Sequence, residues 1–236
     1  MKILKSGAGR ILLATLIVSA SAAGQPATSL SAEDRSALDA LMTRYAQALA
    51  GCRAGEFADL FVPETGYFAS GFRGRMVGRE ELIALVQSER QCIAPAGIAA
   101  GGRSGAAVPT LALEVTPGGV RGIATLDTAE YQDEYMKTDR GWRFASRTVI
   151  MANEKAAGLD ASGVLAIQRL GGDKLGDHYE ADKNGVPRLQ TSGVKVSVAG
   201  DQVTGRAYLK DGTYSDMVYE KLASGEWRVK SSARVP

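Results

Sequence analysis

The chain has 236 residues, of which 45% are hydrophobic, 28 are Lys or Arg and 26 are Asp or Glu, so its net charge is +2 at neutral pH. A composition this close to neutral lacks the clustered Lys and Arg of nucleic-acid-binding proteins, and we expect no nucleic-acid partner. The two cysteines and one histidine show no metal-ligand spacing, so no metal site is expected. The length suits one large globular domain, or one and a half small ones.

The first 22 residues have the features of a cleavable export signal. Three basic residues flank the start of a short apolar run at 11–18, and an Ala-x-Ala pattern follows at 20–22. The run is shorter than the roughly 20 residues of a membrane-spanning helix. We expect cleavage after Ala22 or Ala23 and no membrane contact afterwards. Removal of residues 1–22 takes away three basic residues and no acidic one, which changes the net charge from +2 to −1. The sequence therefore predicts a periplasmic or secreted protein.

Export also bears on the two cysteines. Cys52 and Cys92 each follow a predicted helical segment, and an exported chain meets an oxidising compartment. A disulfide between them is a prediction, which would close a loop of about 40 residues. Two separate buried thiols are the alternative.

The mature chain begins with a predicted amphipathic helix. Ser31 is a typical N-cap with acidic residues after it, and the helix should end near Gly51. Its apolar side chains recur at helical spacing, at Leu38, Leu41, Tyr45 and Leu49. A shorter helix around 57–61, a hairpin within 66–76 and a third helix at 79–91 should follow, and then a loop at 94–107 that is rich in Gly and Ala.

From Val108 the pattern changes to strands. Residues 111–115 alternate between apolar and polar, and a Pro-Gly-Gly turn follows. Residues 120–137 are long enough for one bent strand or two, and residues 142–145 begin the next strand. Helices followed by an antiparallel meander form an α+β pattern.

The C-terminal part repeats this order in a shorter form. Leu159-Asp160-Ala161 opens a helix as Leu30-Ser31-Ala32 does, and alternating strands follow. The segment around Trp227 matches the segment around Trp142, and these are the only tryptophans of the chain. Ordinary hairpins that look alike by chance are the alternative.

The two copies differ in completeness. The first spans residues 30–150 and the second residues 159–236, so the second has lost most of its helical half. Because a sheet with one helix is marginally stable alone, we expect the truncated copy to pack on the first copy or on another subunit.

Three stretches of the first copy resemble the SnoaL-like branch of the nuclear transport factor 2-like superfamily in order and spacing. They are Arg44-Tyr45 with 58–61, then 78–82, then 131–135 with 141–147. The resemblance implies a curved antiparallel sheet that N-terminal helices wrap into a cone, a cystatin-like roll whose pocket holds small, mostly apolar molecules. Members include cyclases, isomerases, dehydratases and other cofactor-independent lyases, and also binding modules with no known chemistry. The resemblance thus implies that no cofactor is needed.

The chain departs from the catalytic pattern of that family. Dehydratase-type members pair an Asp after the first helix with a His on a strand, for acid–base work. Ala50 occupies the place where that Asp would be expected, and residues 97–115 contain no His. The missing pair rules out a simple transfer of that mechanism, but a different one built on Tyr, Arg and carboxylates stays open.

Six residues are candidates for such chemistry: Tyr45, Tyr131, Asp133, Glu134, Arg147 and His178. Tyr45 could line the pocket or be a core tyrosine. Tyr131 and Asp133 share one strand face and Glu134 lies on the other, and a carboxylate enclosed in an apolar cone would have a raised pKa and could act as a base. Arg147 could hold an anionic or phenolic oxygen, or form a structural ion pair. His178 lies in a polar, loop-like segment that predicts an exposed side chain, and its ordinary pKa suits proton transfer near neutrality.

The leading hypothesis from the sequence is an exported, cofactor-independent lyase or isomerase that uses acid–base chemistry on a small hydrophobic molecule, with aromatic compounds among the candidates. The alternative is a non-catalytic small-molecule-binding or assembly module of the same fold, and the missing Asp and His favour it. A homo-oligomer is compatible with both. An enclosed pocket that holds a carboxylate or His beside Tyr or Arg would favour catalysis, and a filled cone would oppose it.

Overall fold

The computed structural model describes residues 29–93, 111–117, 119–126, 129–171, 176–190, 194–208 and 211–236. The predicted export signal and the Gly-rich segment 94–107 lie outside these ranges. Within the described part of the chain, no helix combines the length and the apolar character that crossing a membrane requires.

The N-terminal third folds into helices close to those predicted. Their bounds are α1 (Ala32–Ala50), α2 (Ala54–Ala58), α3 (Gly78–Gln87) and α4 (Arg90–Ile93). Ser31 caps α1, because its Oγ accepts a hydrogen bond from the Asp34 amide at 3.0 Å. The predicted third helix is split at Ser88 into α3 and α4. A disulfide joins Cys52, just after α1, to Cys92 in α4, with the two Cα atoms 5.4 Å apart.

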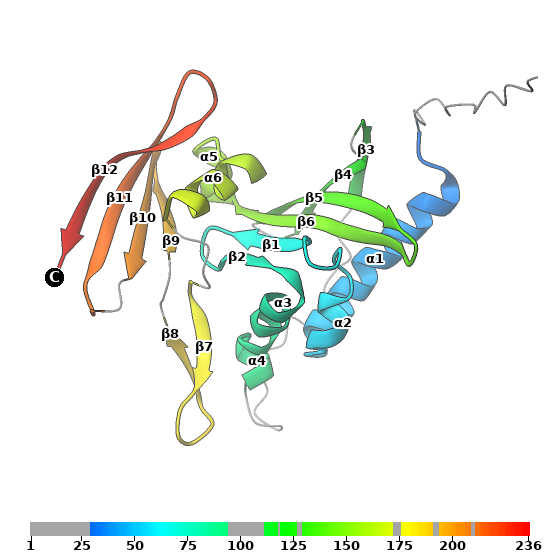
Figure 1. Cartoon of the computed structure of the whole chain (residues 1–236), viewed down its shortest axis with the longest axis horizontal. Helices are drawn as coiled ribbons and strands as arrows, with labels where there is room; N and C mark the ends of the chain where they lie inside the picture. Colours follow the sequence, from blue (N-terminus) through cyan, green and yellow to red (C-terminus); the bar gives the residue numbers. More distant parts are fainter. Residues whose placement is uncertain are drawn as a thin grey trace, which may run out of the picture.

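The helices cover one face of a six-stranded sheet (Figure 1). Its strands are β1 (Tyr67–Ser70), β2 (Gly74–Val77), β3 (Leu111–Thr116), β4 (Gly119–Leu126), β5 (Ala129–Thr138) and β6 (Gly141–Met151). The strand order is β2-β1-β6-β5-β4-β3. All neighbours are antiparallel except β1 and β6, which run parallel. The parallel pair departs from the predicted all-antiparallel sheet because β1 enters from the helical layer and not through a hairpin.

The sheet curves around α1 to form the predicted cone (Figure 1). Glu134 pairs with Ser146 and Tyr135 with Phe144, so Ala145 is an extra residue that forms a β-bulge in β6, which increases the local bend and twist. The start of α1 is fixed to the β5–β6 hairpin by Asp34, whose carboxylate accepts from Lys137 Nζ at 2.8 Å and from Trp142 Nε1 at 2.9 Å. These donors lower the pKa of Asp34. We call the face of this sheet that the N-terminal helices cover the inner face, and we call the opposite face the outer face.

The C-terminal third forms a second, smaller unit. Its elements are α5 (Ala152–Ala156), α6 (Ala161–Gly171), β7 (His178–Ala181), β8 (Pro187–Gln190), β9 (Val194–Ala199), β10 (Gln202–Tyr208), β11 (Tyr214–Lys221) and β12 (Trp227–Val235). Strands β9 to β12 form an antiparallel meander, and β7 and β8 form a hairpin. Helix α6 lies between this meander and the first sheet, in contact with strands of both (Figure 1).

The two meanders share a local arrangement that identifies the second as a truncated copy of the first. In each, the pairing of the third strand with the fourth shifts by one residue just before a tyrosine, Tyr135 in β5 and Tyr219 in β11. Each ring lies over a glycine of the preceding strand. A Cβ added to Gly122 would lie 2.6 Å from the Tyr135 ring, and one added to Gly205 would lie 2.7 Å from the Tyr219 ring. Glycine is needed at both positions because the ring crosses the backbone closely.

A second pair of contacts repeats at the end of each meander. Lys137 Nζ lies 5.9 Å from the ring centre of Trp142, and Lys221 Nζ lies 6.0 Å from that of Trp227. The matching tryptophans of the sequence therefore occupy equivalent places in the two sheets.

Candidate functional site

An ion pair lies at the centre of the cone. Arg147 of β6 and Asp133 of β5 are directly opposite each other on neighbouring strands. Arg147 donates from Nε to Asp133 Oδ1 and from Nη2 to Asp133 Oδ2, both at 2.8 Å. The side chains are 1% and 0% exposed, so this two-bond pair is fully enclosed.

Further groups close around the pair. Tyr135 donates its hydroxyl to Asp133 Oδ2 at 2.8 Å, and Met42 Sδ lies 2.9 Å from Arg147 Nη2. Three aromatic rings pack against the guanidinium, with centres 4.0 to 4.9 Å from Cζ, and they belong to Tyr45, Tyr131 and Phe144. The aromatic contacts continue from Phe144 to Phe61 and Phe57, which fill the interior under α2.

The protonation states of this cluster follow from burial and from the pair itself. Burial disfavours a charged guanidinium, but the contact with Asp133 overcomes this and raises the pKa of Arg147. Burial raises the pKa of both Tyr45 and Tyr135, and the Asp133 charge adds to the rise for Tyr135. Arg147 therefore stays charged, and both phenols keep their protons.

Four of the six candidate residues meet in this cluster: Tyr45, Tyr131, Asp133 and Arg147. The other two lie elsewhere. Glu134 is exposed on the outer face, 3.6 Å from Arg121, as the strand alternation predicts. His178 is in β7, far along the chain from the cone strands.

The prediction of an exposed loop around His178 is wrong. Its side chain is 14% exposed, and Nε2 lies 3.0 Å from Glu180 Oε1. The flanking backbone explains the difference, because the Asp177 amide donates to the Phe72 carbonyl and the Tyr179 amide to the Ser88 carbonyl. These bonds hold the segment as a strand against the end of α3.

Two members of the cluster were not among the predicted site residues. Tyr135 follows Asp133 by two positions on the same strand face, so strand alternation already placed it there. Met42 precedes Tyr45 by three positions, which places both on one side of α1. The sequence around these two residues shows no pattern that would indicate a place in a polar site.

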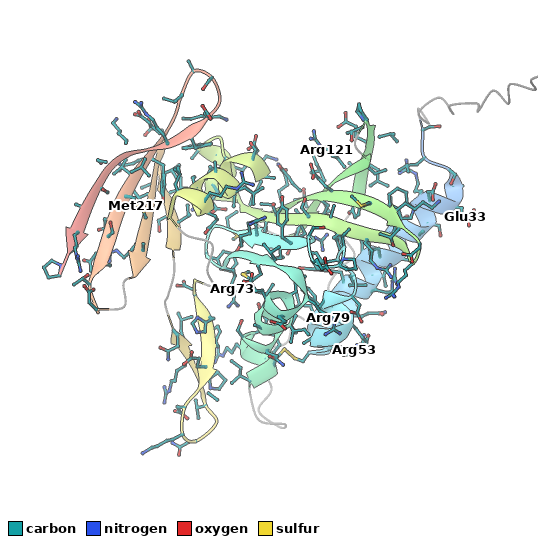
Figure 2. The ribbon with its side chains drawn as sticks, viewed as in Figure 1. Glu33, Arg53, Arg73, Arg79, Arg121 and Met217 are labelled. Atoms are coloured by element: carbon teal, nitrogen blue, oxygen red, sulfur yellow. A yellow bond between two sulfur atoms is a disulfide. The ribbon has the colours of Figure 1, made fainter. Side chains whose placement is uncertain are left out.

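The equivalent place in the second copy holds no ion pair. Gly122 pairs with Asp133, and Asp133 with Arg147. The corresponding chain of partners in the second meander runs from Gly205 to Met217 and Ser232. Figure 2 labels Met217 in this second sheet.

An open groove lies on the outer face of the sheet. This groove of 620 Å³ has the first sheet as its floor and the start of α6 as its wall. One cross-strand row supplies much of the floor: Glu114, Arg121, Glu134, Ser146 and Tyr67, each opposite the next on the neighbouring strand. Figure 2 labels Arg121 of this row on β4. We call this feature the outer groove.

Hydrogen bonds fix the wall of the outer groove to its floor. The Ala161 amide, at the start of α6, donates to Gln132 Oε1 at 2.9 Å. Asp160 caps the helix, because its Oδ1 accepts from the Gly163 amide at 2.8 Å and from the Ser162 hydroxyl at 2.7 Å. No cluster of His, Cys, Asp or Glu among the described residues could hold a metal ion.

Comparison with known proteins matches the part of the chain that forms the first sheet and its helices. A family model described as a SnoaL-like domain matches residues 30–148. No curated protein matches the sequence. Similar solved structures include a protein of unknown function from Mycobacterium tuberculosis, at 19% identity over 60% of this chain and 93% of that chain, with a TM-score of 0.37.

Two others are an NTF2-like protein with a cystatin-like fold from Novosphingobium aromaticivorans (19% identity, 58% of this chain, 88% of that chain, TM-score 0.37) and a hexachlorocyclohexane dehydrochlorinase (19%, 51%, 89%, TM-score 0.35). The family match begins just before α1, ends within β6 and covers half of the chain. The chain therefore belongs to the SnoaL-like family, and its second sheet lies outside the matched domain.

Proposed function

We propose that this protein is an exported SnoaL-like module that binds a small molecule and does not transform it. The observation that carries this proposal is the state of Asp133, the carboxylate at the centre of the cone. Both of its oxygens accept hydrogen bonds from Arg147 or Tyr135, and its side chain is 0% exposed. Protonation of Asp133 during general base catalysis would leave the Arg147 charge buried without a partner, which costs about 3–5 kcal/mol.

Export is part of the proposal. The predicted leader at 1–22 supports it, and so does the disulfide between Cys52 and Cys92, because disulfides persist mainly in oxidising compartments. Intact mass and N-terminal sequencing of the protein from the exported fraction should show a chain that begins at Ala23 or Gly24. A full-length chain in the cytoplasmic fraction would refute export.

A cofactor-independent lyase or isomerase is the second candidate. The gathering of Tyr45, Tyr131, Asp133 and Arg147 around one centre favours it, since phenols, a carboxylate and a guanidinium are groups that acid–base catalysts use. Tyr131 is half-buried, whereas the other three are buried, so Tyr131 is the member of this set that a ligand would reach first.

One experiment separates the two candidates. The mature protein is screened by thermal shift against aromatic and steroid-like compounds, and each ligand that stabilises it is incubated with the protein and analysed by mass spectrometry. Unchanged ligand supports the binding module. Product that forms with the wild type and with Tyr179→Phe, but not with Tyr131→Phe at an unchanged melting temperature, would establish the lyase and refute our proposal.

A further inference from the structure

We propose that the outer groove is a binding site for a small organic cation that carries an apolar group. The proposal rests on the proposed function, because it names a site and a ligand class for a binding protein. The outer groove lies outside the cone, because its wall is helix α6 of the second copy. The argument uses the charge, the apolar surface and the rigidity of the groove.

The charge of the groove is predominantly negative. Exposed carboxylates come from three elements, namely Glu114 of β3, Glu134 of β5 and Asp160 at the start of α6. Among the described residues of the lining, Arg121 is the cationic one, and it lies 3.6 Å from Glu134. Outside the lining, Lys221 donates to the Gly158 carbonyl and acts on Asp160 through its charge, and the Arg75 guanidinium lies against the ring of Tyr67. Within the described lining itself, the excess of carboxylates favours a positively charged ligand.

The start of α6 does not offset this preference. A helix N-terminus attracts anions through its free amide groups. Here the Ala161 amide is bonded to Gln132, and the Gly163 amide is bonded to Asp160. The wall therefore presents the Asp160 carboxylate to the groove, and two of the first amides of the helix are already bonded.

Apolar surface lies next to these carboxylates. Ile123 projects from the outer face of β4 and is 48% exposed, and Leu165 of α6 is half-buried in the opposite wall. The Tyr67 ring forms part of the floor, and the Arg75 guanidinium lies 4.7 Å from its centre. An ammonium group with an attached hydrocarbon would match both kinds of surface.

The groove is also held in shape without a ligand. Asp160 caps α6, and Gln132 binds the first turn of the helix to β5. A preformed site loses little conformational entropy when a ligand binds, which favours affinity for a small molecule.

The test uses 2-phenylethylammonium as the probe and the neutral 2-phenylethanol as its matched analogue, with binding to the mature protein measured by NMR titration. We expect the ammonium compound to bind at least about tenfold more tightly than the alcohol. Glu114→Gln combined with Glu134→Gln should weaken its binding about fivefold. Glu33→Gln, an exposed change at the start of α1 outside the groove, should leave it unchanged.

Three results would overturn the proposal. They are no shift of any resonance by millimolar 2-phenylethylammonium, equal affinities for the ammonium compound and the alcohol, or equal affinities in the wild type and the Glu114→Gln, Glu134→Gln variant. The proposed function is judged separately, because neutral ligands found in the thermal-shift screen would support a binding module even where the groove fails.

Discussion

The enclosed pair between Asp133 and Arg147 gives the sharpest test of how the cone is built. Asp133→Asn keeps the size of the side chain but removes its charge. Arg147, whose side chain is 1% exposed, would then be a buried cation without a counter-charge. Removal of one partner of such a pair destabilises a protein by about 3–5 kcal/mol. Arg147→Met should cost a similar amount, because it leaves the carboxylate with the Tyr135 hydroxyl as its remaining partner.

The double replacement separates charge from packing. Asp133→Leu with Arg147→Met removes both charges and keeps apolar bulk, so it should be far less harmful than the sum of Asp133→Leu and Arg147→Met made singly. Urea denaturation followed by the fluorescence of the two tryptophans measures the free energy of unfolding of the wild type and of each variant. A loss below about 1 kcal/mol for Asp133→Asn would show that water or ligand reaches the pair, and the account of a closed cone would then be wrong.

Three further predictions concern other parts of the fold. Burial raises the pKa of Glu154, which is 3% exposed, so wild-type stability should fall as the pH rises from the ordinary value of 4.5 through the raised pKa of the folded state. Thermal melts of Glu154→Gln should then gain on the wild type at pH 7 but not near pH 4, and parallel curves would contradict this. Reduction of the Cys52–Cys92 disulfide, which closes a loop of 40 residues, should cost about 4 kcal/mol of unfolding free energy by chain entropy, and an unchanged melting temperature in reductant would refute it. Gly122→Ala and Gly205→Ala should each destabilise by about 1–3 kcal/mol in urea titrations, because the new methyl group meets a tyrosine ring, and neutral changes would show that the rings can move.

Local patterns were enough to predict most of the elements. The cap at Ser31, the alternating strands and the matched tryptophans depend on neighbours in the chain, and each appears in the structure where it is expected. The same alternation correctly placed Tyr131 and Asp133 together and Glu134 on the opposite face.

Features that depend on distant parts of the chain were harder to predict. The parallel pairing of β1 with β6 depends on how the helical layer delivers β1 to the sheet. The direct opposition of Asp133 and Arg147 depends on the register of β5 against β6, which a bulge shifts by one residue. His178 looked exposed because its neighbours are polar, whereas bonds to residues about 100 positions earlier fold the segment into a strand.

The two meanders of the chain can be compared to ask why the ion pair between Asp133 and Arg147 exists. The second meander keeps the tyrosine over glycine and the lysine over tryptophan, and yet Met217 and Ser232 occupy the places of Asp133 and Arg147. A meander of this shape therefore forms without the pair. This agrees with the expected stability of the Asp133→Leu, Arg147→Met variant. The pair is present in the copy that encloses a full cone, where the guanidinium joins Met42 and Tyr45 of α1 to the sheet. We infer that its role is to set the position of α1 against β5 and β6. The double variant should therefore lose the contacts with α1. Amide hydrogen exchange should become faster in α1 and stay unchanged in β9 to β12.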